Sequence, residues 1–213
     1  MAELNQDTLN KAYARWAPVY DIVFGKVFET GRKSSIEAAE KIGGRILDVG
    51  IGTGISLSDY SRNNRIAGVD ISAPMLKKAL ERVVTQKLDN VDTIAVMDAK
   101  RLGFPDNFFD VVVAQYVITA VPEPEATLDE FVRVCKPGGE VILVNHIGAE
   151  SGPRFLFEAC FAPLARRLGW RPEFKWDKLA NWERGHGGVT LIERRPMPPM
   201  GHFSLIRYGK RAA

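Results

Sequence analysis

The stretch Ile46-Leu47-Asp48-Val49-Gly50-Ile51-Gly52-Thr53-Gly54 decides the fold of this 213-residue chain. Its apolar start predicts a buried strand, and its three glycines predict a tight turn directly after that strand. Glycine has no Cβ, so the backbone of such a turn can bend sharply and approach a ligand closely. The stretch Ile66-Ala67-Gly68-Val69-Asp70 then predicts a second strand that ends in an acid. This layout is typical of a nucleotide-cofactor site at the carboxyl end of a parallel sheet, where Asp70 would accept hydrogen bonds from a ribose.

The spacing of the glycines narrows the choice of nucleotide. A dinucleotide fingerprint has the pattern Gly-x-Gly-x-x-Gly, whereas the glycines here are residues 50, 52 and 54, and residue 55 is isoleucine. No lysine follows the turn, which argues against a triphosphate-binding P-loop. A zwitterionic amino-acid ligand fits better, with its ammonium near Asp48 and its carboxylate near backbone N–H groups.

Alternating strands and helices predict an α/β fold, with a mostly parallel sheet that carries helices on both faces. Besides the first two strands we expect further strands over residues 91–97, 110–115, 140–145, 189–193 and 203–208, the last two as a closing hairpin. We expect helices over residues 33–42, 73–86 and 124–134, and a turn over 136–139. Residues 6–29 show a helical stripe that Pro18 interrupts.

Taken together, these motifs over residues 40–146 resemble the class I S-adenosylmethionine-dependent methyltransferases. The resemblance implies a seven-stranded Rossmann-like sheet with an antiparallel edge hairpin, and S-adenosylmethionine as cofactor. It implies that Asp48 and the three glycines hold the methionine part, that Asp70 holds the ribose, and that Asp98 accepts a hydrogen bond from the adenine amine. The other expected cofactor contacts are Tyr20, Ile71, Met75, Ala99 and Gln115. For Ile71 and Met75, ordinary core packing is the alternative interpretation.

Composition and charge limit the function classes. The hydrophobic share of 46% suits a single domain over residues 1–213. The net charge of +3 argues against a general nucleic-acid binder. From residue 150 onward, twelve Lys/Arg face six Asp/Glu, which indicates an anionic partner or a solvated basic face.

The two cysteines, Cys135 and Cys160, are far apart and show no metal-ligand spacing. We therefore expect no metal site and no disulfide, which favours the reducing cytoplasm. No signal-peptide pattern and no run of about 18 apolar residues is found.

Three further stretches extend the resemblance over nearly the whole chain. Residues 13–25, 141–146 and 168–172 look like motifs of bacterial phosphatidylethanolamine N-methyltransferases of the quinone-methyltransferase-like type. This implies a peripheral enzyme at the inner face of the membrane, which methylates phosphatidylethanolamine and its methylated derivatives towards phosphatidylcholine. The alternative is a methyltransferase for a quinone or another hydrophobic small molecule. A nicotinamide-dependent oxidoreductase and a non-catalytic cofactor-binding protein are hypotheses from other classes.

His146 is the expected general base, because it ends the fifth strand, where substrate sites open in such sheets. Related phosphoethanolamine methyltransferases pair a tyrosine of an N-terminal helix with a histidine at this place. Tyr13 matches that tyrosine one residue off in spacing, so Tyr20 remains its rival.

Two segments are expected to shape the acceptor side. Residues 1–32 would form a helical cap over the active site, and residues 150–185 a helical insertion. The aromatic and arginine-rich part of that insertion, residues 153–171, can lie on an anionic membrane surface, serve as a lid, or pack as a core helix. The sequence does not specify the oligomeric state.

Overall fold

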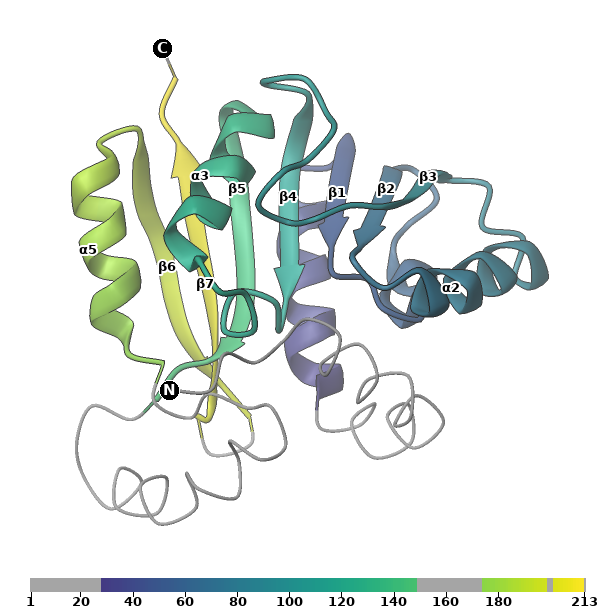
Figure 1. Cartoon of the computed structure of the whole chain (residues 1–213), viewed down its shortest axis with the longest axis horizontal. Coiled ribbons are helices and arrows are strands. Elements are labelled where there is room, and N and C mark those ends of the chain that lie inside the picture. The colour runs from purple at the N-terminus through teal and green to yellow at the C-terminus, as the bar shows by residue number, and fades with distance from the viewer. Residues whose placement is uncertain (1–27, 149–173, 199–200, 213) are drawn as a thin grey trace.

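The computed structural model describes residues 28–148, 174–198 and 201–212. Seven strands form one sheet in the order β3-β2-β1-β4-β5-β7-β6 (Figure 1). The strands are β1 Arg45–Val49, β2 Arg65–Asp70, β3 Val91–Val96, β4 Phe109–Gln115, β5 Cys135–His146, β6 Val189–Met197 and β7 Phe203–Lys210. The strands β1 to β5 pair in parallel, whereas β7 pairs antiparallel with both β5 and β6. The predicted fold class is therefore confirmed, with the hairpin at one edge of the sheet and β6 as its outer strand.

Helices cover both faces of the sheet, as the sequence predicts. One buried core lies between the sheet and the helices α3 Pro124–Val134 and α5 Trp176–His186. The other lies between the sheet and three elements: the helix over residues 28–40, the short 3-10 helix η1 Ile55–Asp59, and α2 Ala73–Thr85. Figure 1 shows α3 in front of the sheet and the purple helix 28–40 behind it. Because both faces are covered, the middle of each central strand is largely apolar, and residues 111–114 of β4 are fully buried.

The turn expected over residues 136–139 is instead a bulge inside β5. Phe109 of β4 pairs with Cys135, but Val111 already pairs with Glu140, so residues 136–139 have only Asp110 opposite them. A Cβ at Gly139 would lie 2.4 Å from the Asp110 carbonyl oxygen, so only glycine fits where the two strands approach. The ammonium of Lys136 lies 2.6 Å from the Asp110 carboxylate and fixes the bulge on its other side.

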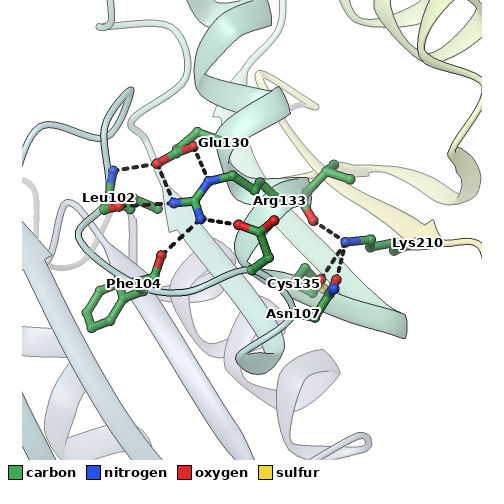
Figure 2. A network of polar contacts seen from close by, with 9 residues as sticks. Leu102, Phe104, Asn107, Glu130, Arg133, Cys135 and Lys210 are labelled. Carbon is green, nitrogen blue, oxygen red and sulfur yellow. Dashed lines mark hydrogen bonds and ion pairs between the residues drawn. The ribbon is translucent and has the colours of Figure 1, made fainter.

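Residues 97–108 join β3 to β4 without a helix, and the Arg133 side chain of α3 holds this loop in place (Figure 2). The guanidinium donates to the carbonyls of Leu102 at 3.0 Å and Phe104 at 2.9 Å, and forms an ion pair with Asp106 at 2.6 Å. Glu130 completes the network, because it accepts from Arg133 at 2.7 Å and from the Leu102 N–H at 2.6 Å. These bonds from Arg133 hold the pKa of Glu130 below its usual value.

The C-terminal end of β7 is fixed to the same region through Lys210 (Figure 2). Its ammonium donates to the side chain of Asn107 at 2.6 Å and to the carbonyls of Val132 and Cys135, both at 2.8 Å. Carbonyls at the end of a helix have no partner within the helix, so a lysine there satisfies them. Burial lowers the pKa of Lys210.

The two segments predicted to shape the acceptor side fall mostly outside the described residues. Of the expected cap over residues 1–32, the structure describes residues 28–32, which belong to the helix 28–40. Of the expected insertion over residues 150–185, it describes the part from residue 174, which includes most of α5. No helix within the described ranges is both long enough and apolar enough to cross a membrane.

We predict that Arg133→Gln lowers the free energy of unfolding by about 1–3 kcal/mol, because it leaves partly buried carbonyls and Glu130 without their donor. Urea unfolding followed by circular dichroism measures the change. The control is Arg65→Gln, which removes an exposed ion pair with Asp92 and should cost well under about 1 kcal/mol. Equal losses in the two variants would show that the loop does not depend on Arg133.

Candidate cofactor and active site

The glycine turn after β1 leaves open space above one of its residues. Gly50, Gly52 and Gly54 have φ angles of 76°, 54° and 75°, a region that favours glycine. A Cβ at Gly50 would lie 2.2 Å from the side chain of Val117, so the chain packs tightly there. A Cβ at Gly52 would meet nothing within 4 Å. The backbone of Gly52 therefore faces free space, where a ligand can approach it closely.

The end of β2 fixes the position of this turn. The carbonyl of Val69 accepts hydrogen bonds from the N–H groups of Gly50 at 2.7 Å and Ile51 at 3.2 Å. The Asp70 carboxylate accepts from the Gly52 N–H at 2.8 Å through one oxygen, and from the Ser72 N–H at 2.8 Å through the other. Burial raises the pKa of Asp70, and these backbone bonds act against the rise. The backbone N–H of Ile71 also bonds to this carboxylate, and a carboxylate has about four acceptor sites, so one remains for a ribose hydroxyl.

Asp48 is a buried carboxyl directly before the turn, with an exposed fraction of 1%. The hydroxyls of Ser56 and Tyr60 both donate to the same oxygen, Oδ2, at 2.8 Å and 3.2 Å. Within the described part of the chain no donor reaches Oδ1. Burial raises the pKa of Asp48 to about 7, and the charge of Asp70 adds to the rise. A cation that met Oδ1 would supply the missing partner, as the expected ammonium of the cofactor does.

The residues expected around the adenine differ in exposure. The side chain of Ile71 is 42% exposed, so it offers an apolar surface against which the adenine ring can pack. Met75 is only 7% exposed, in agreement with its alternative interpretation as core. Asp98 is exposed and accepts from the Lys100 N–H at 2.9 Å through Oδ1. Ala99 packs partly against the core beside it.

Two hydrogen bonds join the carboxyl end of β4 to the helix 28–40. The Gln115 amide donates to the Ser35 hydroxyl at 3.0 Å, and the Tyr116 hydroxyl donates to the Phe28 carbonyl at 3.1 Å. A Cβ at Gly31 would lie 2.4 Å from the Tyr116 hydroxyl oxygen, so glycine permits this close contact. Gln115 therefore has a structural partner at the place where it is expected to contact the cofactor.

An aromatic cluster surrounds His146 at the carboxyl end of β5. The ring of Phe203 lies 6.4 Å from His146 in an edge-to-face arrangement and 5.3 Å from the ring of Tyr116. Phe28 lies 4.2 Å from Tyr116. On its other side, His146 stacks on His202 with ring centroids 6.1 Å apart. His146 is partly buried, so its imidazole is held by neighbours and still reachable.

The structure brings most of the predicted site residues to one edge of the sheet, at the lower side of Figure 1. They stand at or just after the carboxyl ends of the five parallel strands: Asp48, Gly50, Gly52, Gly54, Asp70, Ile71, Asp98, Ala99, Gln115 and His146. Tyr13 and Tyr20 lie outside the described residues. Within the described ranges, no group of three or more His, Cys, Asp or Glu side chains could hold a metal ion.

Sequence reasoning did not single out four residues that the structure places here: Ser35, Ser56, Tyr60 and His202. Ser56 and Tyr60 follow the glycine turn closely in the sequence. No spacing pattern there predicts that their hydroxyls bond to Asp48. The position of His202 depends on the register of β7, in which Phe203 pairs with His146.

The chain is similar to known methyltransferases. The Methyltransferase domain family matches residues 47–143. A phosphatidylethanolamine N-methyltransferase of Cereibacter sphaeroides is 40% identical over 96% of this chain and 98% of its own length. A demethylmenaquinone methyltransferase of Paenarthrobacter aurescens is 35% identical over 61% of this chain and 51% of its own length. The solved structure of a SAM-dependent methyltransferase from Aquifex aeolicus matches 81% of this chain and 88% of its own, with a TM-score of 0.61 and 17% identity.

We predict that Gly52→Val weakens the binding of S-adenosylmethionine at least tenfold, because its methyl groups fill the space that the ligand needs. The matched control is Gly138→Val in the bulge of β5. Gly138 also has a positive φ, 78°, and a Cβ there would also meet nothing within 4 Å. Both variants should lose similar stability, and calorimetry should find the affinity loss only for Gly52→Val. Equal affinities would contradict the placement of the cofactor over Gly52.

We also predict that Asp48→Asn stabilises the cofactor-free protein more at pH 8 than at pH 5. The folded pKa, about 7, is above the usual value of 3.8, so folding takes up a proton between these values. The wild type therefore loses stability as the pH rises through this range, whereas asparagine does not ionise. Thermal melts at the two pH values measure the difference. Asp89→Asn, an exposed control, should change the melting temperature little at either pH.

Proposed function

This chain belongs to the S-adenosylmethionine-dependent methyltransferases, and we propose that it methylates the amine of phosphatidylethanolamine and of its methylated derivatives, towards phosphatidylcholine. The observation that carries the proposal is the 40% identity to the Cereibacter sphaeroides enzyme over 96% of this chain. That similarity extends beyond the cofactor-binding residues 47–143 to nearly the whole chain. The enzyme would act at the cytoplasmic face of the membrane, as a peripheral protein.

The second candidate is methylation of a quinone or another hydrophobic small molecule. The demethylmenaquinone methyltransferase of Paenarthrobacter aurescens is 35% identical, but the match covers only 51% of that protein. The test is transfer of a labelled methyl group to vesicles that contain phosphatidylethanolamine, beside the same assay with a demethylquinone. Label in the phospholipid supports the first candidate, and label only in the quinone replaces it with the second.

When bound, S-adenosylmethionine would supply an electrophilic sulfonium methyl group: an amine lone pair attacks the methyl carbon in line, so that a C–N bond forms as the C–S bond breaks and the thioether leaves. The residues at the carboxyl edge contribute mainly by positioning, which can lower a barrier by several kcal/mol. Asp48 would hold the amino-acid part through Oδ1, the open backbone at Gly52 would lie beneath it, and Asp70 would bind the ribose hydroxyls. Asp98 and Ile71 would place the adenine.

His146 would take the proton that an ammonium group must lose before it can act as a nucleophile. Its place supports this role, because it ends β5 next to the carboxyl end of β4, where the reacting groups would meet. Tyr13, its expected partner, and Tyr20, expected to cover the cofactor, lie outside the described residues. The ring of Tyr116, at the end of β4, is a candidate to hold the growing quaternary cation by cation–π attraction.

The points where two proposed segments join the described chain support a role at the acceptor site. Phe28, the first described residue of the proposed cap, lies against Tyr116 at the carboxyl edge. Gly148 and Phe174 flank residues 149–173, and the Gly148 N–H donates to the Phe174 carbonyl at 2.9 Å. The two described residues that flank 149–173 therefore lie next to each other, and Gly148 is two residues along the chain from His146. We propose that the arginines of the insertion, Arg154, Arg166, Arg167 and Arg171, meet lipid phosphates, since a guanidinium matches phosphate oxygens.

We predict that His146→Ala lowers turnover roughly 10²–10⁴-fold and leaves the affinity for S-adenosylmethionine nearly intact, as loss of a general base does. The deficit should shrink as the pH approaches the pKa of the acceptor amine, because the substrate then arrives without its proton. Rates over a pH series measure this. His186→Ala, the same change at the end of α5, should keep the wild-type profile. A deficit that is constant with pH would exclude His146 as the base.

We further predict that the protein binds vesicles with anionic lipid, binds zwitterionic vesicles little, and is released by salt. Each basic residue near an anionic surface contributes about 1 kcal/mol, so four arginines together would contribute to binding where one alone would not. Arg166→Glu combined with Arg167→Glu should reduce flotation sharply. Lys77→Glu combined with Lys78→Glu on α2 makes the same change in charge and should not. Absence of flotation at low salt would favour a lid or core role and a soluble acceptor.

A further inference from the structure

The two hydrogen bonds of Asp48 have an unusual arrangement for a buried carboxyl. Ser56 from η1 and Tyr60 just after it donate to one oxygen, Oδ2, and nothing in the described chain donates to the other. Both donors are themselves buried, with exposed fractions of 5% and 3%. Such a pair holds the carboxyl at a fixed rotation, in which Oδ1 remains an acceptor without a partner.

Among the described residues, no positively charged group acts on Asp48. Both donors are neutral hydroxyls, and burial together with the charge of Asp48 raises the pKa of Tyr60 well above its usual value, so Tyr60 stays a phenol. The charged groups that act on this cluster are all acidic: Asp70 acts on Asp48, and Glu40 and Asp59 act on Tyr60. Of the basic residues near this cluster, Arg32 forms an ion pair with Asp59 at 2.8 Å, and Arg82 donates to the carbonyl of Thr53 at 3.2 Å.

We propose that Ser56 and Tyr60 are positioning residues for the cofactor: they aim Oδ1 of Asp48 at the ammonium of S-adenosylmethionine and make its binding depend on loss of the Asp48 proton. The proposal deepens the proposed function, because it rests on Asp48 as the ligand of that ammonium. Burial without a nearby cation makes a carboxyl group hold its proton up to a higher pH, whereas an ammonium beside it favours the ionised form. Binding therefore releases a proton from the protein near neutral pH, since the pKa of Asp48 without cofactor is about 7.

The expected dependence on pH has two limbs. From about pH 6 to pH 7.5 the affinity should rise roughly fivefold to tenfold, as the fraction of ionised Asp48 grows. Above about pH 8 it should fall again, because a free α-amino group loses its own proton with a pKa of about 7.7–8.0. Only the acidic limb belongs to Asp48. Ser56 and Tyr60 lower the pKa of Asp48 through their bonds, so removing either hydroxyl should move this limb to higher pH.

Isothermal titration of the whole protein with S-adenosylmethionine, in two buffers with different heats of ionisation, counts the released protons. For the wild type near pH 7 we expect release of roughly half a proton. Tyr60→Phe and Ser56→Ala should each raise Kd at pH 7 about threefold to tenfold and shift the acidic limb upward. Ser56→Thr, which keeps the hydroxyl, should restore the wild-type curve. Asp48→Asn should bind weakly, without an acidic limb and without proton release.

Tyr208→Phe is the matched control, because Tyr208 is a fully buried tyrosine of β7 whose hydroxyl has no partner in the described chain. It should leave the pH curve unchanged. Unchanged curves in both Tyr60→Phe and Ser56→Ala would overturn the proposal, as would an acidic limb that survives in Asp48→Asn. If Tyr60→Phe does not fold, the smaller change Ser56→Ala decides. A failure of methyl transfer to phospholipid, with these binding curves as expected, would overturn the proposed substrate and leave this inference standing.

Discussion

The hydrogen bond from the Gly52 N–H to the Asp70 carboxylate is the contact on which the candidate site depends. It joins the turn after β1 to the end of β2 and so fixes the two halves of the candidate cofactor site relative to each other. The same carboxylate accepts from the Ser72 N–H and so also fixes the start of α2. Asp70 therefore has a structural task beside its proposed contact with the ribose. A substitution at Asp70 would loosen the turn as well as remove the proposed contact with the ribose. Substitutions at Gly52 and Asp48 are therefore the more direct tests of cofactor binding.

The fold could be predicted from the sequence wherever a local pattern determines it. The glycine turn, the buried strand β4 and the proline at the start of α3 each follow from residues close together in the chain. The bulge in β5 could not be predicted, because Lys136-Pro137-Gly138-Gly139 carries the signals of an ordinary turn. What decides the outcome is the close approach of Gly139 to the Asp110 carbonyl, and that contact exists only after two strands have paired.

The candidate site shows the same division between local pattern and tertiary contact. The acids at the ends of β1 and β2 could be assigned because strand ends of a parallel sheet meet at one edge. The partners of those acids could not be assigned, since Tyr60 reaches Asp48 only after the chain has turned back through η1. Such a buried carboxyl costs stability in the cofactor-free protein. The hydroxyls of Ser56 and Tyr60 offset part of that cost by donating hydrogen bonds to one oxygen. The other oxygen stays available for a cation, as a site for a zwitterionic ligand requires.

The architecture also separates the binding of the cofactor from the choice of acceptor. Residues 47–143, which match the methyltransferase family, contain the glycine turn and the acids of the cofactor edge. The relative that acts on demethylmenaquinone shares about this much of the chain, whereas the phosphatidylethanolamine N-methyltransferase shares nearly all of it. The chain outside residues 47–143 includes the helix 28–40, whose Phe28 lies against Tyr116, and the residues Gly148 and Phe174, which are joined by a hydrogen bond close to the carboxyl edge. With the roles proposed above, a change of acceptor would require changes outside residues 47–143 and around His146, while the bond between Gly52 and Asp70 would serve either acceptor equally.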